Sequence, residues 1–216
     1  MIDIKGAIFD MDGTLLDSMP IWFTVEIDYL KSIGVTPRPN LNEILRSLSG
    51  LETAEYYQAE YGVLKSTEEI ESGRNALLED FYHNIAVPKA GVMRVLEAMH
   101  AKGIKVCVAT ATDRSLAEPA LRRCGILKYA ERIFTCGEEN TSKTSPEIFL
   151  SAAAFLGTEI GETLVVEDAL YAVRTAKNAG FPVAAVYDRS SDDLQDLIKS
   201  LCDHYFVSMD EMLEII

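Results

Sequence analysis

Apolar residues recur along this chain at two spacings, which separate two kinds of region. Short continuous apolar runs predict strands that are buried on both faces. They lie at 4–9, 106–109, 133–135, 164–166 and 183–186. Apolar positions three and four residues apart predict helices between these runs. They lie near 92–102, 115–124, 146–156 and 169–179. Strands that alternate with helices in this way indicate a parallel sheet covered by helices on both faces.

No strand pattern appears between residues 19 and 84. Helical spacing predicts four helices in this segment, near 21–33, 41–48, 52–61 and 67–82. The tail 191–216 adds two helical stretches around an edge strand at 204–207. We therefore predict an α/β fold: a doubly wound, Rossmann-like parallel-sheet core formed by residues 1–18 and 85–216, with residues 19–84 inserted as an all-helical cap.

Several residues indicate where the predicted helices begin and end. Gly34, Gly103 and Gly180 each close a helical stretch, because glycine readily adopts the left-handed conformation that ends helices. Ser115 followed by Glu118 has the spacing of a capping box, in which each side chain accepts a backbone N–H of the first turn.

Composition limits the classes of partner. The chain has 216 residues, of which 48% are hydrophobic and 25% charged, which is typical of a globular protein. Its net charge of −14 argues against DNA or RNA as a partner. The apolar runs are shorter than the roughly 20 residues that span a bilayer, and the first residues lack the pattern of a signal peptide. We expect a cytoplasmic monomer with no membrane or nucleic-acid partner.

The four cysteines show no paired spacing of the kind that metal sites use. They are Cys107, Cys124, Cys136 and Cys202. We expect buried, reduced thiols rather than disulfides.

Two carboxylates directly follow the first predicted strand, in Asp10-Met11-Asp12-Gly13-Thr14. Residues two apart at a strand end point to the same side, so Asp10 and Asp12 can face one point. Such anions repel each other unless a cation or a phosphoryl group lies between them. A calcium loop of the EF-hand type is excluded, because its sixth position would be Leu15 instead of Gly and its twelfth Ile21 instead of Glu.

Three other strand ends carry polar groups of complementary chemistry. Thr110-Ala111-Thr112 offers a hydroxyl and backbone N–H groups for phosphate oxygens. Lys143 precedes a helix start, where its charge could offset that of a phosphoryl group. Glu167-Asp168 provides the carboxylates that Mg²⁺ prefers. Each stretch alone is an ordinary cap, surface lysine or turn. Because ligands bind at the carboxyl ends of the strands in doubly wound sheets, we expect all of them in one crevice.

These four motifs, in this order, resemble those of the haloacid dehalogenase-like superfamily, in the subgroup with a helical cap after the first strand. The resemblance covers nearly the whole chain. It implies a Mg²⁺-dependent phosphatase that acts on a small phosphorylated metabolite through an aspartyl phosphate. Asp10 would be the nucleophile and Asp12 the general acid/base. The implied phosphate-binding groups are Gly13, Thr110, Ala111, Thr112 and Lys143. The implied metal ligands are Asp10, the backbone carbonyl of Asp12, and Asp168 with Glu167 beside it.

Individual residues also favour or disfavour the alternative functions. Dehalogenases and phosphonate hydrolases of this subgroup typically lack the second aspartate, so Asp12 argues against both. A sugar phosphomutase resembling β-phosphoglucomutase stays open, although Trp22 and Thr53 stand near the places of its hinge histidine and cap arginine. A non-enzymatic phosphate-sensing module is disfavoured, because a receiver domain has no inserted cap. Smaller departures from the family pattern are Ser142, Thr144 and Ala169.

The cap is expected to determine the substrate and to exclude water as it closes. Its candidate pocket residues, each of which could equally be ordinary helix surface or core, are Trp22, Arg46, Tyr56, Tyr57 and Arg74.

Overall fold

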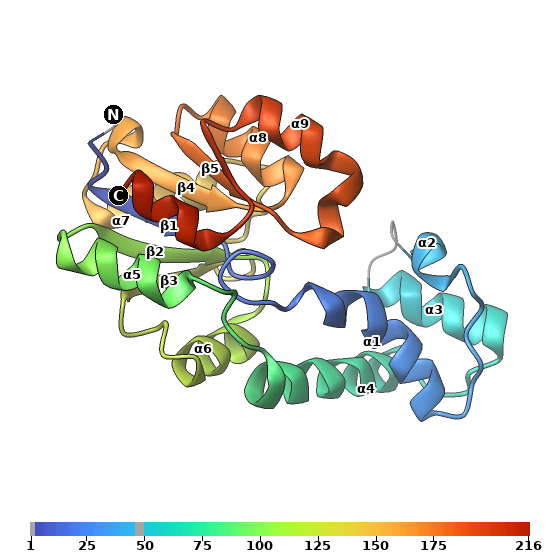
Figure 1. Cartoon of the computed structure of the whole chain (residues 1–216). Coiled ribbons are helices and arrows are strands. Elements are labelled where there is room, and N and C mark those ends of the chain that lie inside the picture. Colours follow the sequence, from blue (N-terminus) through green and yellow to red (C-terminus); the bar gives the residue numbers. More distant parts are fainter. Residues whose placement is uncertain (1–2, 46–49) are drawn as a thin grey trace. The chain divides into compact units, whose positions relative to one another are not determined.

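The computed structural model describes residues 3–45 and 50–216 (Figure 1). The chain divides into two compact units. Unit 1 consists of Met1–Ser18 and Ala86–Ile216, and unit 2 of Met19–Ile85. Arg46 and the end of the helix predicted at 41–48 lie outside the described residues.

Unit 1 is built on one six-stranded, all-parallel sheet with the order β3-β2-β1-β4-β5-β6. The strands are β1 (Gly6–Phe9), β2 (Lys105–Thr110), β3 (Ala130–Thr135), β4 (Thr163–Glu167), β5 (Val183–Val186) and β6 (His204–Phe206). Phe9 at the end of β1 pairs with Val108 on one side and Val166 on the other. The chain first builds the sheet outward through β2 and β3, and then continues from the other side of β1 with β4. The carboxyl end of β1 is therefore at the topological switch point, where such sheets bind ligands.

Helices cover both faces of this sheet. They are α5 (Val92–Ala101), α6 (Arg114–Arg123), α7 (Glu147–Leu156), α8 (Leu170–Asn178) and α9 (Gln195–Leu201). Alternate strand residues such as Ile8, Val165 and Val183 form one buried cluster with α7, α8 and α9. The buried residues of α5 are absent from that cluster, and α5 packs instead against β2 and the 3-10 turn Met209–Glu214. The predicted doubly wound α/β fold is confirmed.

The predicted helix ends agree with the structure in part. Gly103 and Gly180, at φ +71° and +92°, follow the ends of α5 and α8. The capping box at Ser115 was wrong. Asp113 is the N-cap, and its carbonyl accepts from the Ala117 N–H at 2.9 Å, so Ser115 already lies in the first turn of α6. Glu118 instead accepts from Arg122 at 2.7 Å.

Unit 2 contains only helices among its described residues. They are α1 (Met19–Ser32), α2 (Leu41–Leu45), α3 (Gly50–Tyr61), α4 (Thr67–Asp80) and the π-helical turn η1 (Phe81–Ile85). A capping box that the sequence reading missed, Ser66 with Glu69, begins α4. The apolar faces of α1 to α4 meet in a core that includes Leu30, Leu41 and Ile70.

A partly buried ion pair joins α1 to α4 inside unit 2. Glu26 accepts from Arg74 Nε at 2.7 Å and from the Tyr57 hydroxyl at 2.7 Å. Two of the candidate pocket residues, Tyr57 and Arg74, are thus engaged with Glu26. Trp22, another candidate, donates to the Tyr82 hydroxyl at 3.0 Å.

All four cysteines are free thiols, but only Cys107 is fully buried, and the other three are partly exposed. Within residues 3–45 and 50–216, none of the helices combines the length and the apolar content required to cross a bilayer.

Candidate active site

Asp10 lies directly after β1, at the switch point of the sheet. Its backbone N–H donates to the Val166 carbonyl at 2.9 Å, which continues the pairing of β1 with β4. The residue is only 6% exposed. Its Oδ1 accepts a hydrogen bond from Lys143 Nζ, whereas its buried Oδ2 has no hydrogen-bond partner among the described residues. A buried carboxylate oxygen without a donor indicates a place for a cation or a reacting group.

Lys143 connects Asp10 to the next strand of the sheet. It comes from the loop between β3 and α7 and is 3% exposed. Besides Asp10, its ammonium donates to Glu167 Oε1 at 2.7 Å. The sequence prediction that Lys143 and Asp10 meet above one sheet edge therefore agrees with the geometry.

Three carboxylates gather around this lysine. Asp10, Glu167 and Asp168 each place an oxygen so that the three atoms lie within 4.8 Å of one another, and all three residues are buried. Thr14, in the loop after β1, donates its hydroxyl to Asp168 Oδ1 at 3.2 Å. Thr14 was not among the predicted site residues, although it belongs to the motif that drew attention to Asp10.

Electrostatics show that this cluster has excess negative charge. Burial raises the pKa of Asp10 to about 6, even though Lys143 opposes the shift. Burial and the neighbouring Asp10, Glu167 and Asp188 carboxylates also raise the pKa of Asp168. Burial alone would lower the pKa of Lys143, but the Asp10 and Glu167 carboxylates outweigh it and raise that pKa. One ammonium therefore does not neutralise the group, and a further cation would stabilise it.

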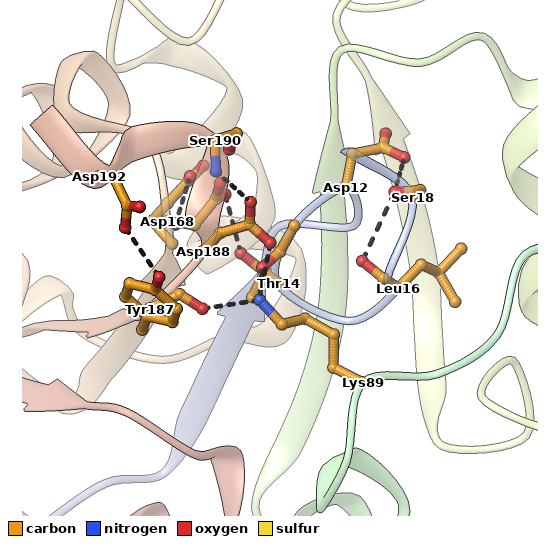
Figure 2. A network of polar contacts seen from close by, with 12 residues as sticks. Asp12, Thr14, Leu16, Ser18, Lys89, Asp168, Tyr187, Asp188, Ser190 and Asp192 are labelled. Atoms are coloured by element: carbon orange, nitrogen blue, oxygen red, sulfur yellow. Dashed lines mark hydrogen bonds and ion pairs between the residues drawn. The ribbon is translucent and has the colours of Figure 1, made fainter. Parts of the chain in front are cut away.

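Asp12 has partners of its own. Ser18 donates to its Oδ1 at 2.6 Å, and Thr112 donates to its Oδ2 at 2.7 Å. Figure 2 shows Asp12 and Ser18 well apart from Asp168. The Asp12 carboxylate is not part of the three-carboxylate group. Strand geometry ends at Phe9, so the alternation of side chains along β1 does not extend to Asp12.

The loop after β2 holds the remaining predicted residues. Thr110 is fully buried, and its hydroxyl oxygen accepts from the Thr112 N–H at 3.0 Å. Thr112, predicted to be a phosphate-binding residue, donates its hydroxyl to Asp12. Ala111 is exposed between them. Ser18, the second partner of Asp12, was not predicted, because a serine four residues after the motif gives no recognisable signal.

The donor set fits a hard divalent cation. Mg²⁺ prefers carboxylate oxygens and usually takes one or two of them together with water and phosphate. The unpartnered Oδ2 of Asp10 and the adjoining Asp168 carboxylate supply such oxygens.

Comparisons with known proteins point to one family of hydrolases. Residues 4–180 match the family model of haloacid dehalogenase-like hydrolases. The chain is 31% identical to N-acetylmuramic acid 6-phosphate phosphatase from Pseudomonas aeruginosa, over 85% of this chain and 81% of that one. It is 27% identical to a phosphorylated carbohydrates phosphatase from Thermotoga maritima, over 82% of each chain.

A solved structure extends the similarity to the whole fold. The crystal structure of a predicted β-phosphoglucomutase from Thermotoga maritima superposes with a TM-score of 0.85 and 25% identity, covering 98% of both chains. The predicted enzyme class, a haloacid dehalogenase-like phosphatase, is confirmed by the family match and by relatives that are named phosphatases. By sequence and by structure, this chain belongs to the haloacid dehalogenase-like hydrolase family.

Proposed function

We propose that the protein is a Mg²⁺-dependent phosphomonoester hydrolase that acts through an aspartyl phosphate on Asp10. The observation that carries this proposal is the state of the Asp10 carboxylate. It is buried, bonded to Lys143 through one oxygen and unpartnered at the other, beside two further acids. A structural aspartate would instead have both oxygens satisfied.

In the first step, a carboxylate oxygen of Asp10 attacks the phosphorus of the substrate. The bond between phosphorus and the leaving oxygen breaks, and the Asp12 carboxyl gives its proton to that oxygen. In the second step, the Asp12 carboxylate takes a proton from water, whose oxygen attacks the phosphorus. The bond to Asp10 then breaks, inorganic phosphate is released, and both carboxyl groups return to their initial states.

The hydroxyls that hold Asp12 suit this role. Ser18 and Thr112 orient both of its oxygens, so the proton is presented from one fixed place. Proton transfer by a positioned group contributes roughly 10²–10⁴-fold to rate.

Positive charge must offset the phosphate, because phosphoryl transfer is catalysed mainly by positioning and charge neutralisation. Lys143 supplies one cation, and the Thr110 hydroxyl and the Ala111 backbone N–H are the proposed phosphate donors. Asp10 and Asp168, with Glu167 beside them and the backbone carbonyl of Asp12, would hold Mg²⁺. When bound, this ion would screen the nucleophile from the negative charge of the phosphate.

We propose a phosphorylated sugar or a related small metabolite as the substrate class. Support comes from the two relatives described above, whose names refer to phosphorylated carbohydrates and to N-acetylmuramic acid 6-phosphate. Residues 19–84, which we propose act as a cap, are the proposed source of selectivity among such substrates.

A sugar phosphomutase is the second candidate, because the solved structure with a TM-score of 0.85 is of a predicted β-phosphoglucomutase. Added sugar bisphosphate separates the two functions. A mutase is primed by it and isomerises a sugar monophosphate, whereas a phosphatase releases inorganic phosphate from both compounds.

The test is phosphate release from a panel of sugar phosphates, with Mg²⁺ and with EDTA. We expect turnover only with Mg²⁺. Asp10→Asn should abolish turnover of every substrate, because no aspartyl phosphate can form. Asp17→Asn is the matched control, since Asp17 is an exposed acid in the same segment. Turnover by Asp10→Asn at the rate of the control would contradict the proposal.

A further inference from the structure

Lys89 lies just after the second crossing between the two units, and the sequence reading did not single it out. Its neighbour Pro88 forms an isolated antiparallel bridge with Leu16, on the first crossing. The Lys89 N–H donates to the Leu15 carbonyl at 3.0 Å. The backbone of Lys89 is thus bonded to the same segment that carries Asp12, and all of these residues belong to unit 1.

The Lys89 side chain reaches three acceptors from different parts of unit 1 (Figure 2). Its Nζ donates to the Gly13 carbonyl at 2.7 Å, to the Tyr187 carbonyl at 2.7 Å and to Asp188 Oδ2 at 2.9 Å. An ammonium has three donors, so all of them are used. A lysine with three protein acceptors has no donor left for a phosphate, and its role must lie in what it holds.

Asp188 completes the contact from the end of β5. It is 6% exposed, and its Oδ1 accepts from the Ser190 N–H at 2.9 Å. Burial would raise the pKa of Asp188, but the hydrogen bonds from Ser190 and the Lys89 ammonium outweigh burial and hold that pKa below its ordinary value. Asp188 therefore fixes the Lys89 ammonium in a partly buried ion pair.

The hydrogen bond from Lys89 to Gly13 matters because of the position of Gly13 in the chain. It separates Asp12, the proposed acid/base, from Thr14, whose hydroxyl orients Asp168. Gly13 has a φ of +85°. Because glycine has no Cβ, its own sterics restrict the orientation of the two neighbouring peptide planes only weakly. The Gly13 N–H donates to the Leu16 carbonyl at 3.0 Å, which fixes the plane shared with Asp12. Lys89 fixes the next plane, which is shared with Thr14.

We propose that Lys89 is a positioning residue of the active site, which holds the Gly13 carbonyl so that Asp12 and Thr14 keep their orientations. This inference rests on the proposed function, since it assigns the reaction to the same site. Asp188 has the subordinate role of holding the Lys89 ammonium in place.

The test separates the hydrogen bond from Lys89 to the Gly13 carbonyl from the ion pair between Lys89 and Asp188. Lys89→Met removes both and leaves the buried Asp188 carboxylate without its cation, so the variant should also be less stable. Lys89→Met combined with Asp188→Asn removes both charges, and replacing a buried ion pair by neutral groups is well tolerated. The double variant should melt near the wild-type temperature, although its Gly13 carbonyl no longer accepts the hydrogen bond from Lys89.

For the double variant we expect kcat to fall by about 10-fold or more, as with other residues that orient ligands. KM for the sugar phosphate should stay at the wild-type value, because Lys89 has no donor for substrate. Binding of Mn²⁺, measured by electron paramagnetic resonance without turnover, should weaken by about 10-fold through the loss of Thr14 orientation. Asp188→Asn alone keeps the bond to Gly13 and should lower kcat less than the double variant.

Lys177→Met is the matched control. Lys177 pairs with Asp203 at 2.7 Å, and Asp203 accepts from the N–H of Val183, at the start of β5. This pair is at the opposite end of the strand from Asp188, so kcat and Mn²⁺ binding should not change.

Wild-type kcat and Mn²⁺ affinity in the folded double variant would overturn the positioning role and leave the proposed function intact. A wild-type protein that neither binds Mn²⁺ nor hydrolyses any sugar phosphate would instead contradict the proposed function itself.

Discussion

At the scale of single residues, Asp10 combines burial with an unsatisfied oxygen, a state that is unfavourable without a ligand. Its pKa is raised from 3.8 to about 6 because burial disfavours the carboxylate more than Lys143 favours it. The metal-free folded protein therefore binds a proton at Asp10 more tightly than the unfolded chain does. By linkage, this group lowers stability as the pH rises from about 4 to 6, and the loss is complete above pH 6.

Because the Asp10 carboxylate lowers the stability of the metal-free protein at high pH, its removal should have a pH-dependent effect, which Asp10→Asn tests in EDTA. At pH 8 the variant should be more stable than wild type, by up to about 3 kcal/mol, because about two pKa units correspond to that free energy. At pH 4 most of the gain should vanish, since Asp10 is then almost fully protonated in the folded protein and about half protonated in the unfolded chain. Lys143 keeps Glu167 as its partner at 2.7 Å in the variant. Thermal melts at the two pH values measure the difference, and an equal difference at both would contradict the raised pKa.

At the scale of elements, loops and helix starts determine how the site is supported. Gly91 is the N-cap of α5 at φ +90°, and a Cβ placed there would lie 2.7 Å from the Asp210 backbone nitrogen. Only glycine fits this approach, which packs the start of α5 against the C-terminal turn Met209–Glu214.

Gly91→Ala should therefore destabilise the protein by about 1–3 kcal/mol, because it adds backbone strain to a steric clash. Gly161→Ala is its control, since a Cβ at Gly161 would meet nothing within 4 Å and its φ is not positive. Denaturant midpoints of the two variants provide the measurement. Equal midpoints would mean that the turn moves aside at no cost.

At the scale of the whole molecule, the three-carboxylate group belongs entirely to unit 1. A cation bound there stabilises the folded state by an amount that rises with the logarithm of its concentration once that concentration exceeds Kd. Unit 2 contributes none of these carboxylates, so a metal should act on the thermal unfolding of unit 1.

Mg²⁺ at about 100 times its Kd should stabilise the protein by about 2.7 kcal/mol relative to EDTA. For a chain of this size, that corresponds to a rise in Tm of roughly 5–10 °C. Calorimetry checks the shift. Where two transitions are resolved, only one should respond, and Asp168→Asn should remove most of the effect. An unchanged Tm in the presence of saturating Mg²⁺ would contradict the metal site.

The sequence alone determined the secondary structure and the placement of the central charges. Buried parallel strands have apolar runs, and helices have a 3.6-residue period, so the α/β alternation is visible in the pattern. Parallel strands bring their carboxyl ends to one edge, which is why Asp10, Lys143 and Glu167-Asp168 could be expected to meet.

Only the tertiary structure decided what lies beyond the strand ends. The turn at Gly13, the hydroxyls of Ser18 and Thr112 on Asp12, and the reach of Lys89 to the Gly13 carbonyl depend on side-chain directions in irregular backbone. Irregular backbone has no period, so no spacing along the chain encodes these contacts. They form because folding brings two chain crossings and the ends of β2 and β5 to the loop after β1.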